Sequence, residues 1–142
     1  DVAFALESST DSGATSVHDA RSGGTSARLA SRSRLPVGII GAAVVNQDGF
    51  IVASVFPNEV DEDLVGGMAA SLLGVGERIA ADLMRSDMEQ TYVKSPKGYI
   101  IINAIDDDSS LVLLVTREAK LGLIFLETKR TIAELQRELR DL

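Results

Sequence analysis

Hydrophobic residues occur in short blocks along the chain from residue 37 onward, and these blocks have the lengths of secondary-structure elements. Residues 37–45 are mostly Val, Ile, Ala and Gly, a composition typical of a buried strand. A polar segment with Asp48 and Gly49 follows, and Asp-Gly favours a tight turn because Gly tolerates positive φ. Residues 50–55 form a second apolar block. The pattern therefore predicts a β-hairpin at the start of a folded domain.

The remaining blocks predict two helices and three more strands. The first helix is expected over residues 61–85, strands over 89–94, 99–105 and 111–116, and a closing helix over 120–142. The first helix starts with three acidic residues, which suit a helix N-terminus. The closing helix carries an apolar line made by Ile132, Leu135, Leu139 and Leu142. The order ββαβββα, with short turns between strands, predicts an α+β fold in which helices cover an antiparallel sheet.

The middle of the predicted helix at residues 61–85 is unusual because residues 64–76 carry no charge on any face. One face contains only small residues, at i, i+3, i+4 and i+7: Gly67, Ala70, Ser71 and Gly74. The bulkier face contains Leu64, Met68, Leu72, Val75 and Ile79. We expect the bulkier face to pack on the sheet and the small face to admit the helix of a second subunit, as in a homodimer. The alternative is that the small face lies under the N-terminal region of the same chain.

Residues 1–36 differ in composition from the rest of the chain. Fourteen of these 36 residues are Ser, Thr or Gly, and four acidic residues balance four arginines. Such a segment has little apolar surface to offset the entropy of ordering it. We therefore interpret residues 1–36 as a low-complexity, Ser/Gly-rich tail or linker, and residues 37–142 as one domain.

Composition narrows the possible functions. The chain has 142 residues, a formal net charge of −7 and a pI near 4.6, which argues against a nucleic-acid partner. It has no Cys and a single His, His18. The residues needed for a nucleophilic triad, or for a metal site built from His or Cys, are therefore almost entirely lacking. The longest uncharged runs, residues 35–47 and 64–76, are shorter than the roughly 20 residues of a membrane-spanning helix. We expect neither an enzyme nor membrane insertion.

No cofactor or metal motif is recognisable. The Gly74-Val75-Gly76 segment lies inside a predicted helix and is therefore no dinucleotide-binding loop. The acidic triplet Asp106-Asp107-Asp108 lacks the ligand spacing and the terminal Glu of a calcium loop. We therefore expect no cofactor and no metal site.

The order of the blocks resembles the Roadblock family of small regulatory domains, and the archaeal and bacterial members in particular. The resemblance covers residues 38–142. Its carriers are Gly41-Ala42-Ala43-Val44-Val45 leading into residues 48–54, the Ala/Gly helix, residues 89–93 with 98–102, residues 111–115, and Leu121-Gly122-Leu123-Ile124 at the start of the closing helix. Together they span about 105 residues in one fixed order.

This resemblance implies a profilin-like or longin-like fold, with five antiparallel strands, the Ala/Gly helix on one face and the closing helix on the other. It also implies a homodimer formed through the Ala/Gly helix and the strand at 89–94. The predicted dimer interface therefore comprises Gly67, Ala70, Ser71, Gly74, Gln90 and Tyr92. Family members usually act without catalysis, in the cytoplasm, by regulating Ras-like small GTPases or by scaffolding larger assemblies.

One part of the chain departs from the family pattern. Family members usually have an amphipathic helix directly before the first strand, beside the closing helix. Here residues 27–36 stand at that place, and they are short, interrupted by Ser and stopped by Pro36. Either a degraded helix lies there, or the face is open for the N-terminal region or another chain.

Two functions follow from these observations. The first is a non-enzymatic homodimeric scaffold that binds a Ras-like GTPase. The candidate contact residues are Ser54, Asn58, Glu59, Asp61 and Glu62. The simpler interpretation of the acidic residues among them is a solvent-exposed helix start. The second is a structural subunit of a larger assembly, held together by residues 1–36. A small-molecule sensor of the same overall shape is a further alternative, because such pockets leave little trace in a sequence.

Overall fold

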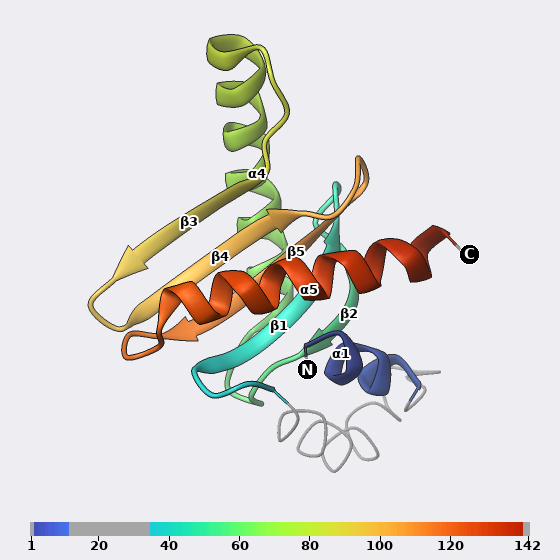
Figure 1. Ribbon diagram of the computed structural model, residues 1–142, viewed down its shortest axis with the longest axis vertical. Helices are drawn as coiled ribbons and strands as arrows, with labels where there is room; N and C mark the ends of the chain where they lie inside the picture. The colour runs from blue at the N-terminus through green and yellow to red at the C-terminus, as the bar shows by residue number, and fades with distance from the viewer. Residues whose placement is uncertain (1, 12–34, 141–142) are drawn as a thin grey trace.

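The computed structural model describes residues 2–11 and 35–140, and Figure 1 shows their arrangement. The described elements are α1 (Val2–Asp11), β1 (Ile39–Asn46), β2 (Ile51–Val55), α4 (Glu62–Met84), β3 (Gln90–Ser95), β4 (Gly98–Ala104), β5 (Ser109–Thr116) and α5 (Leu121–Arg140). From β1 onward, the order of strands and helices is the predicted one, and the boundaries agree to within about two residues.

The five strands form one antiparallel sheet with the order β2-β1-β5-β4-β3. The first hairpin joins β1 and β2, and the Asn46 side chain shapes its turn by accepting hydrogen bonds from the N–H groups of Asp48 and Phe50, both at 3.0 Å. The longest pairing joins β1 to β5 at the centre of the sheet. The edge strands are therefore β2 and β3.

The sheet separates two hydrophobic layers. Figure 1 shows the helices that cover them, α5 on one face of the sheet and α4 on the other. One layer lies under α5 and contains Ile101, Leu111 and Leu113 of the sheet with Ile124 and Leu135 of the helix. The other lies under α4. The predicted five-stranded sheet with helices on both faces is thus confirmed. On α5, Ile132 and Leu135 pack toward the sheet as predicted, whereas the Leu139 side chain and Leu142 lie outside the described residues.

The N-terminal region corrects a prediction. Residues 2–11, expected to belong to an unpacked tail, form α1, and four of its side chains, Val2, Ala3, Ala5 and Leu6, are at most 1% exposed. The prediction failed because the composition of all 36 residues hid a short apolar cluster at residues 2–6, which has enough non-polar surface to dock. The rest of the predicted tail, including His18 and most of residues 27–36, lies outside the described residues.

The orientation of α4 corrects a second prediction. The helix begins and ends as expected, with Asp61 capping its N-terminus by accepting a hydrogen bond from the Leu64 N–H at 3.2 Å. Its sheet-facing side, however, is the stripe Gly66, Ala69, Leu73 and Ala80, and the bulky residues predicted to pack there are largely exposed. The physical reason is close approach: a Cβ on Gly66 would lie 2.3 Å from the Gly49 carbonyl oxygen of the β1–β2 turn.

Candidate dimer and partner-binding surface

The edge strand β3 is the first part of the candidate surface. Within the described residues it pairs only with β4, so the backbone N–H and C=O groups on its outer side are available to another strand. Its side chains do not protect this edge, because Tyr92 and Val93 are each about half exposed. Lys94 and Lys97 contribute the nearest positive charges. An open edge with apolar side chains is suited to pairing with a second chain.

The second part is the apolar stripe of α4, which we define as Leu64, Met68, Val75, Ile79 and Leu83. Each of these side chains is 46–77% exposed. In Figure 1 the second half of α4 also extends beyond the sheet, past the start of β3. Large apolar side chains gathered along one helix face are a common mark of an interaction surface.

The direction of the apolar stripe follows from helix geometry. Ala70 faces the β1–β2 turn, since a Cβ on Gly49 would lie 3.4 Å from the Ala70 Cβ. Met68 and Ile79 lie nearly on the opposite side of the helix from Ala70, because successive residues are about 100° apart. The apolar stripe therefore points away from the β1–β2 turn, toward the part of the sheet that α4 leaves uncovered.

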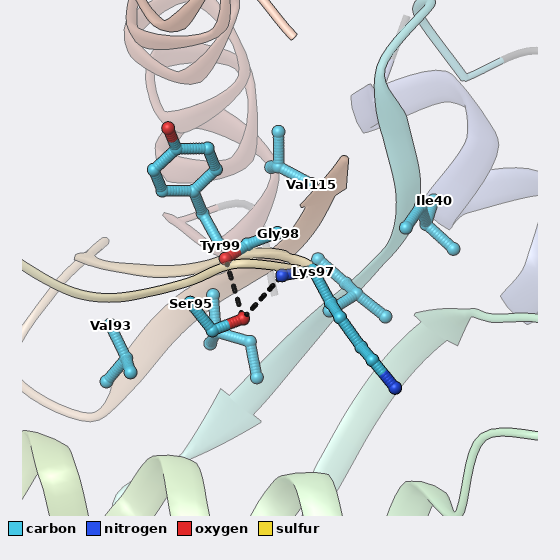
Figure 2. Close-up of a pocket in the computed structure, with 9 residues that line it drawn as sticks. Ile40, Val93, Ser95, Lys97, Gly98, Tyr99 and Val115 are labelled. Atoms are coloured by element: carbon cyan, nitrogen blue, oxygen red, sulfur yellow. Dashed lines mark hydrogen bonds between the residues drawn. The ribbon is translucent and has the colours of Figure 1, made fainter. Parts of the chain in front are cut away.

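That uncovered part contains an apolar hollow of about 200 Å³, which Figure 2 shows in close-up. Its lining includes Ile40, Val93, Ile100 and Leu114, with Lys97 at the β3–β4 turn. In Figure 2, Val93 and Lys97 lie on one side of the hairpin, whereas Tyr99 and Val115 extend to the other. The hollow therefore lies on the α4 side of the sheet.

The β3–β4 turn that borders the hollow is held by one hydroxyl group. The Ser95 Oγ accepts a hydrogen bond from the Lys97 N–H and donates one to the Gly98 carbonyl, both at 3.2 Å (Figure 2). Gly98 has φ +150°, and a Cβ there would lie 2.4 Å from the Val115 carbonyl oxygen. The turn is thus fixed by local bonds and close packing, so the rim of the hollow has a defined shape.

A second hollow, of about 440 Å³, lies where α4 meets β3. It is lined by Ile79, Met84 and Met88 together with Gln90 and Thr91. A Cβ on Gly76 would lie 2.5 Å from the Met88 sulfur, so the chain after α4 packs closely against the helix. The apolar stripe, the edge of β3 and both hollows are therefore adjacent on one side of the molecule.

The six predicted dimer-interface residues lie in two groups. Gly67, Ala70, Ser71 and Gly74 lie on α4 away from the sheet-facing stripe, and at both glycines a Cβ would meet open space. Gln90 and Tyr92 lie on β3, but on the α5 side of the sheet, because Tyr92 is paired with Ile101 of that layer. Gln90 also donates a hydrogen bond to Asn103 Oδ1 at 2.8 Å. The two groups therefore lie on different elements and on opposite sides of the sheet.

The five candidate GTPase-contact residues are close together in the chain, between the end of β2 and the first turn of α4. Asn58, Glu59 and Asp61 are exposed, whereas Ser54 and Glu62 are partly buried. Asp61 has a structural role as the N-cap of α4. The segment nevertheless presents several acidic side chains to solvent beside the helix that carries the apolar stripe.

The sequence identifies most residues of the apolar stripe but places them against the sheet, and it gives no sign of the first hollow. The sheet-facing stripe of Gly66, Ala69, Leu73 and Ala80 has a helical spacing and mostly small side chains, as does the face that the sequence predicts for the dimer. Periodicity alone could not decide which of the two would face the sheet. The close approach of Gly66 to Gly49, which does decide it, depends on the tertiary fold.

Among the described helices, α4 is also the one long and apolar enough, by length and composition, to cross a membrane. Core helices of soluble folds pass the same test, but only 22% of the apolar window of α4 is buried. Three charged residues, Glu77, Arg78 and Asp82, interrupt its second half. The absence of membrane insertion therefore stays a prediction. No group of three or more potential metal ligands occurs among the described residues.

Comparison with known proteins agrees with this architecture. Residues 29–115 match the Roadblock/LC7 domain. Two uncharacterized proteins of Methanocaldococcus jannaschii, MJ1340 and MJ0310, are each 36% identical over 100 residues, which cover 70% of this chain and 86% of the relative.

Solved structures are similar in fold at lower sequence identity. A Roadblock/LC7 domain from Streptomyces avermitilis aligns with a TM-score of 0.70 at 17% identity, covering 77% of this chain and 91% of that one. MglB of Myxococcus xanthus aligns with a TM-score of 0.68 at 17% identity, covering 73% and 85%. A gliding protein, MglB of Thermus thermophilus, aligns with a TM-score of 0.67 at 15% identity, covering 97% and 93%.

Proposed function

The chain belongs to the Roadblock/LC7 family, and we propose that it acts as a homodimeric regulatory scaffold that binds a Ras-like small GTPase. The observation that carries the proposal is the apolar stripe of α4, which lies exposed beside the open edge of β3. Both surfaces are unfavourable in an isolated subunit and are suited to burial in a symmetric pair.

The open edge of β3 limits how two copies can pair. In an antiparallel pair of β3 strands, residues directly opposite must point to the same face, so the two-fold axis passes through a residue such as Tyr92 or Val93. Thr91 of one copy then lies opposite Val93 or Ser95 of the other. The two sheets would join into one, with both α4 helices on the same side.

This pairing brings the apolar surfaces of the two copies together. In each subunit α4 passes close to Thr91, since a Cβ on Gly76 would lie 3.9 Å from the Thr91 Cβ. The end of α4 in one copy would therefore extend over residues 93–95 of the other, beside the hollow formed by Val93, Ile100 and Leu114. We infer that Val75, Ile79 and Leu83 contact the second copy there. Gly67, Ser71 and Gly74 would lie at the margin of this contact.

The GTPase part of the proposal is supported by the family and by the position of the acidic segment. Glu59, Asp61 and Glu62 lie at the start of α4, at the opposite end of that helix from the inferred dimer contact. The exposed residues Glu59 and Asp61 would therefore stay accessible in the dimer. A partner with a basic or polar surface would fit this segment. No catalytic role for this chain is part of the proposal.

A pull-down tests the GTPase interaction. The full chain, immobilised, is offered Ras-like GTPases of its source organism loaded with GDP or with a non-hydrolysable GTP analogue. The proposal expects retention of one GTPase with a preference for one nucleotide state. Retention in neither state would contradict it. A Glu59→Lys and Glu62→Lys double variant, which keeps the Asp61 cap, should weaken binding by at least about tenfold if the acidic segment makes the contact.

The docking of α1 favours a second candidate function, a structural subunit whose N-terminal region links copies into a larger assembly. Residues 2–6 carry a docking surface of their own, which an unpacked linker would not. Removal of this docking surface should then reduce the size of the assembly while leaving the α4 contact in place. The two functions are compatible, because they use opposite faces of the sheet.

A further inference from the structure

The groove occupied by α1 lies on the α5 side of the sheet, where α1 packs on β2 and β1 beside α5 (Figure 1). Val2, Ala5 and Leu6 belong to the same hydrophobic cluster as Val44, Val55 and Ile124 of the domain. Phe4, in contrast, is 50% exposed. The helix therefore docks by one narrow face, in which small alanines allow close approach and Leu6 supplies the largest side chain.

One polar contact fixes the end of the helix. The Val2 N–H donates a hydrogen bond to Glu127 Oε1 at 3.3 Å. Glu127 is 13% exposed on its side-chain atoms and also lies 3.7 Å from Arg130, measured between Oε2 and Nη1. A carboxylate at a helix N-terminus satisfies an unpaired N–H and opposes the positive end of the helix dipole. The groove thus recognises both the apolar face and the N-terminal end of a helix.

The chain connection does not determine whose groove α1 fills. Residues 12–34 separate the two described parts, and 23 residues reach at most about 80 Å when extended. A domain of about 100 residues has a radius of gyration of only about 13 Å. The family match also begins at residue 29, so α1 lies outside the matched region. Every feature that binds α1 is present in every copy of the chain.

We propose that this groove is a helix-docking site that takes the α1 of a second copy of the chain as well as the chain's own α1, so that copies exchange N-terminal helices. An empty groove would expose side chains such as Val55, which is fully buried in the docked state. The groove therefore requires a helix, and the helix that fits it is α1. This inference does not depend on the proposed function, because it uses neither α4 nor β3.

The concentration of grooves around each α1 determines whether exchange of α1 between copies can be detected. Because α1 is covalently joined to the domain, it meets its own groove at an effective concentration of the order of millimolar. Exchange is therefore weak between dilute separate copies, and becomes comparable to self-docking when two grooves are held close together, as in an assembly. A free peptide with the α1 sequence competes in the same way.

The test uses the full chain and a synthetic peptide of residues 1–11, labelled at its C-terminus. In the chain variant Leu6→Asp, the buried leucine becomes a carboxylate and the chain's own helix should leave the groove. We expect this variant to bind the peptide saturably in fluorescence anisotropy. The wild-type chain should bind at least about tenfold more weakly, because its own helix competes.

Matched peptides check that binding uses the observed face. A peptide with Leu6→Asp should bind at least about tenfold more weakly than the parent peptide. A peptide with Phe4→Asp, altered at a half-exposed position, should stay within about threefold. Equal binding of the Leu6→Asp peptide, or no binding to a Leu6→Asp chain with wild-type circular dichroism, would overturn the proposal. If that chain does not fold, the milder Leu6→Ala chain takes its place in the same titration.

Exchange between full chains has its own readout. Two copies that both carry Ile79→Glu, which disrupts the α4 surface, are mixed, and the tagged copy also carries Leu6→Asp. At chain concentrations that approach the millimolar effective concentration of a tethered α1, cross-linking should let the tagged copy retain an untagged copy with intact α1, and should not let it retain an untagged copy with Leu6→Asp. Equal retention of both would contradict exchange. Because α4 is disabled throughout, the result is separate from the success or failure of the proposed dimer.

Discussion

The two faces of the sheet differ in how completely the chain covers them. On the α5 side, two helices cover the strands, and Ile101, Leu111, Leu113 and Val115 are fully buried. On the α4 side, one helix crosses the sheet at an end of the strands and leaves an apolar hollow beside it. The same helix exposes most of its large side chains. The chain thus buries the α5 side of the sheet with its own helices, whereas the α4 side keeps an exposed apolar surface of the kind that a partner covers.

The difference shows that the burial of a helix depends on the residues through which it packs. α5 packs through large side chains such as Ile124 and Leu135, which fill the space above the sheet. α4 packs through Gly66, Ala69 and Ala80 together with Leu73, so it comes close to the sheet, and most of its other large side chains are left on the outside. A partner that covers these exposed side chains would bury apolar surface that the isolated chain leaves in water, and this burial would stabilise the complex.

The largest expected effect compares two neighbouring residues of β5. Leu113 faces the completed side and is fully buried, whereas Leu114 is partly buried and lines the hollow. Leu113→Ala should lower the free energy of unfolding by about 2–5 kcal/mol, because it removes core contacts and leaves a cavity. Leu114→Ala should cost less than half as much. Urea unfolding of both variants checks this, and equal losses would contradict the difference between the faces.

A charge on the apolar stripe should act on association instead of folding. Ile79→Glu should raise the dimer dissociation constant by at least about tenfold, because a carboxylate would be buried in the interface. Leu126→Glu is the matched control, since Leu126 is similarly exposed on α5. Sedimentation or light scattering across a dilution series measures both. If Leu126→Glu dissociated the dimer and Ile79→Glu did not, the interface would lie on the α5 side of the sheet, which would contradict the proposal.

Two substitutions of Asp61, the N-cap of α4, distinguish a structural role of this residue from a role in partner binding. Asp61→Ala should destabilise the fold by about 1 kcal/mol through loss of the N-cap. Asp61→Asn should keep most of this stability, because its side-chain oxygen can still accept from the Leu64 N–H. Thermal unfolding measures the first effect, and GTPase pull-down the second. Loss of GTPase binding by Asp61→Asn, at unchanged stability, would show that the carboxylate contacts the partner.

The smallest effect distinguishes the small-residue face of α4, which the sequence predicts as the dimer contact, from the apolar stripe, which the structure leaves exposed. Gly67→Ala should stabilise the helix by at most about 1 kcal/mol, since a Cβ there meets open space. Gly67→Leu should leave the dimer constant within about threefold if the apolar stripe carries the contact and the small face lies at its margin. A dimer that dissociates on Gly67→Leu would return the interface to the small face predicted from the sequence.

The sequence predicted the elements well and the packing of α4 poorly, for an identifiable reason. Strands and helices follow from local periodicity and turn residues, such as the Asp48-Gly49 turn and the Asp61 cap, and all of these were recognised. The sheet-facing side of α4 depends on the contact between Gly66 and Gly49, which are distant in sequence, so no local pattern reveals it.

The N-terminal helix was missed for the opposite reason. Its signal is local, a cluster of apolar residues at 2–6. The average composition of residues 1–36, which is rich in Ser, Thr and Gly, conceals this cluster. The dimer role of Gln90 and Tyr92 on the edge strand stays a prediction. The hollow beside that strand could not be predicted, because its lining comes from four strands that the sheet brings together, β1, β3, β4 and β5. Tertiary geometry of this kind leaves no mark at any one position.

The central claim is that the α4 side of the sheet is completed by a second copy. The most direct measurement is the solution mass of the full 142-residue chain by light scattering, compared with the same chain carrying Ile79→Glu. We expect twice the chain mass of 15.1 kDa for the wild type and a shift toward a single chain for the variant. A wild-type chain that is monomeric at concentrations of about 100 μM would contradict it.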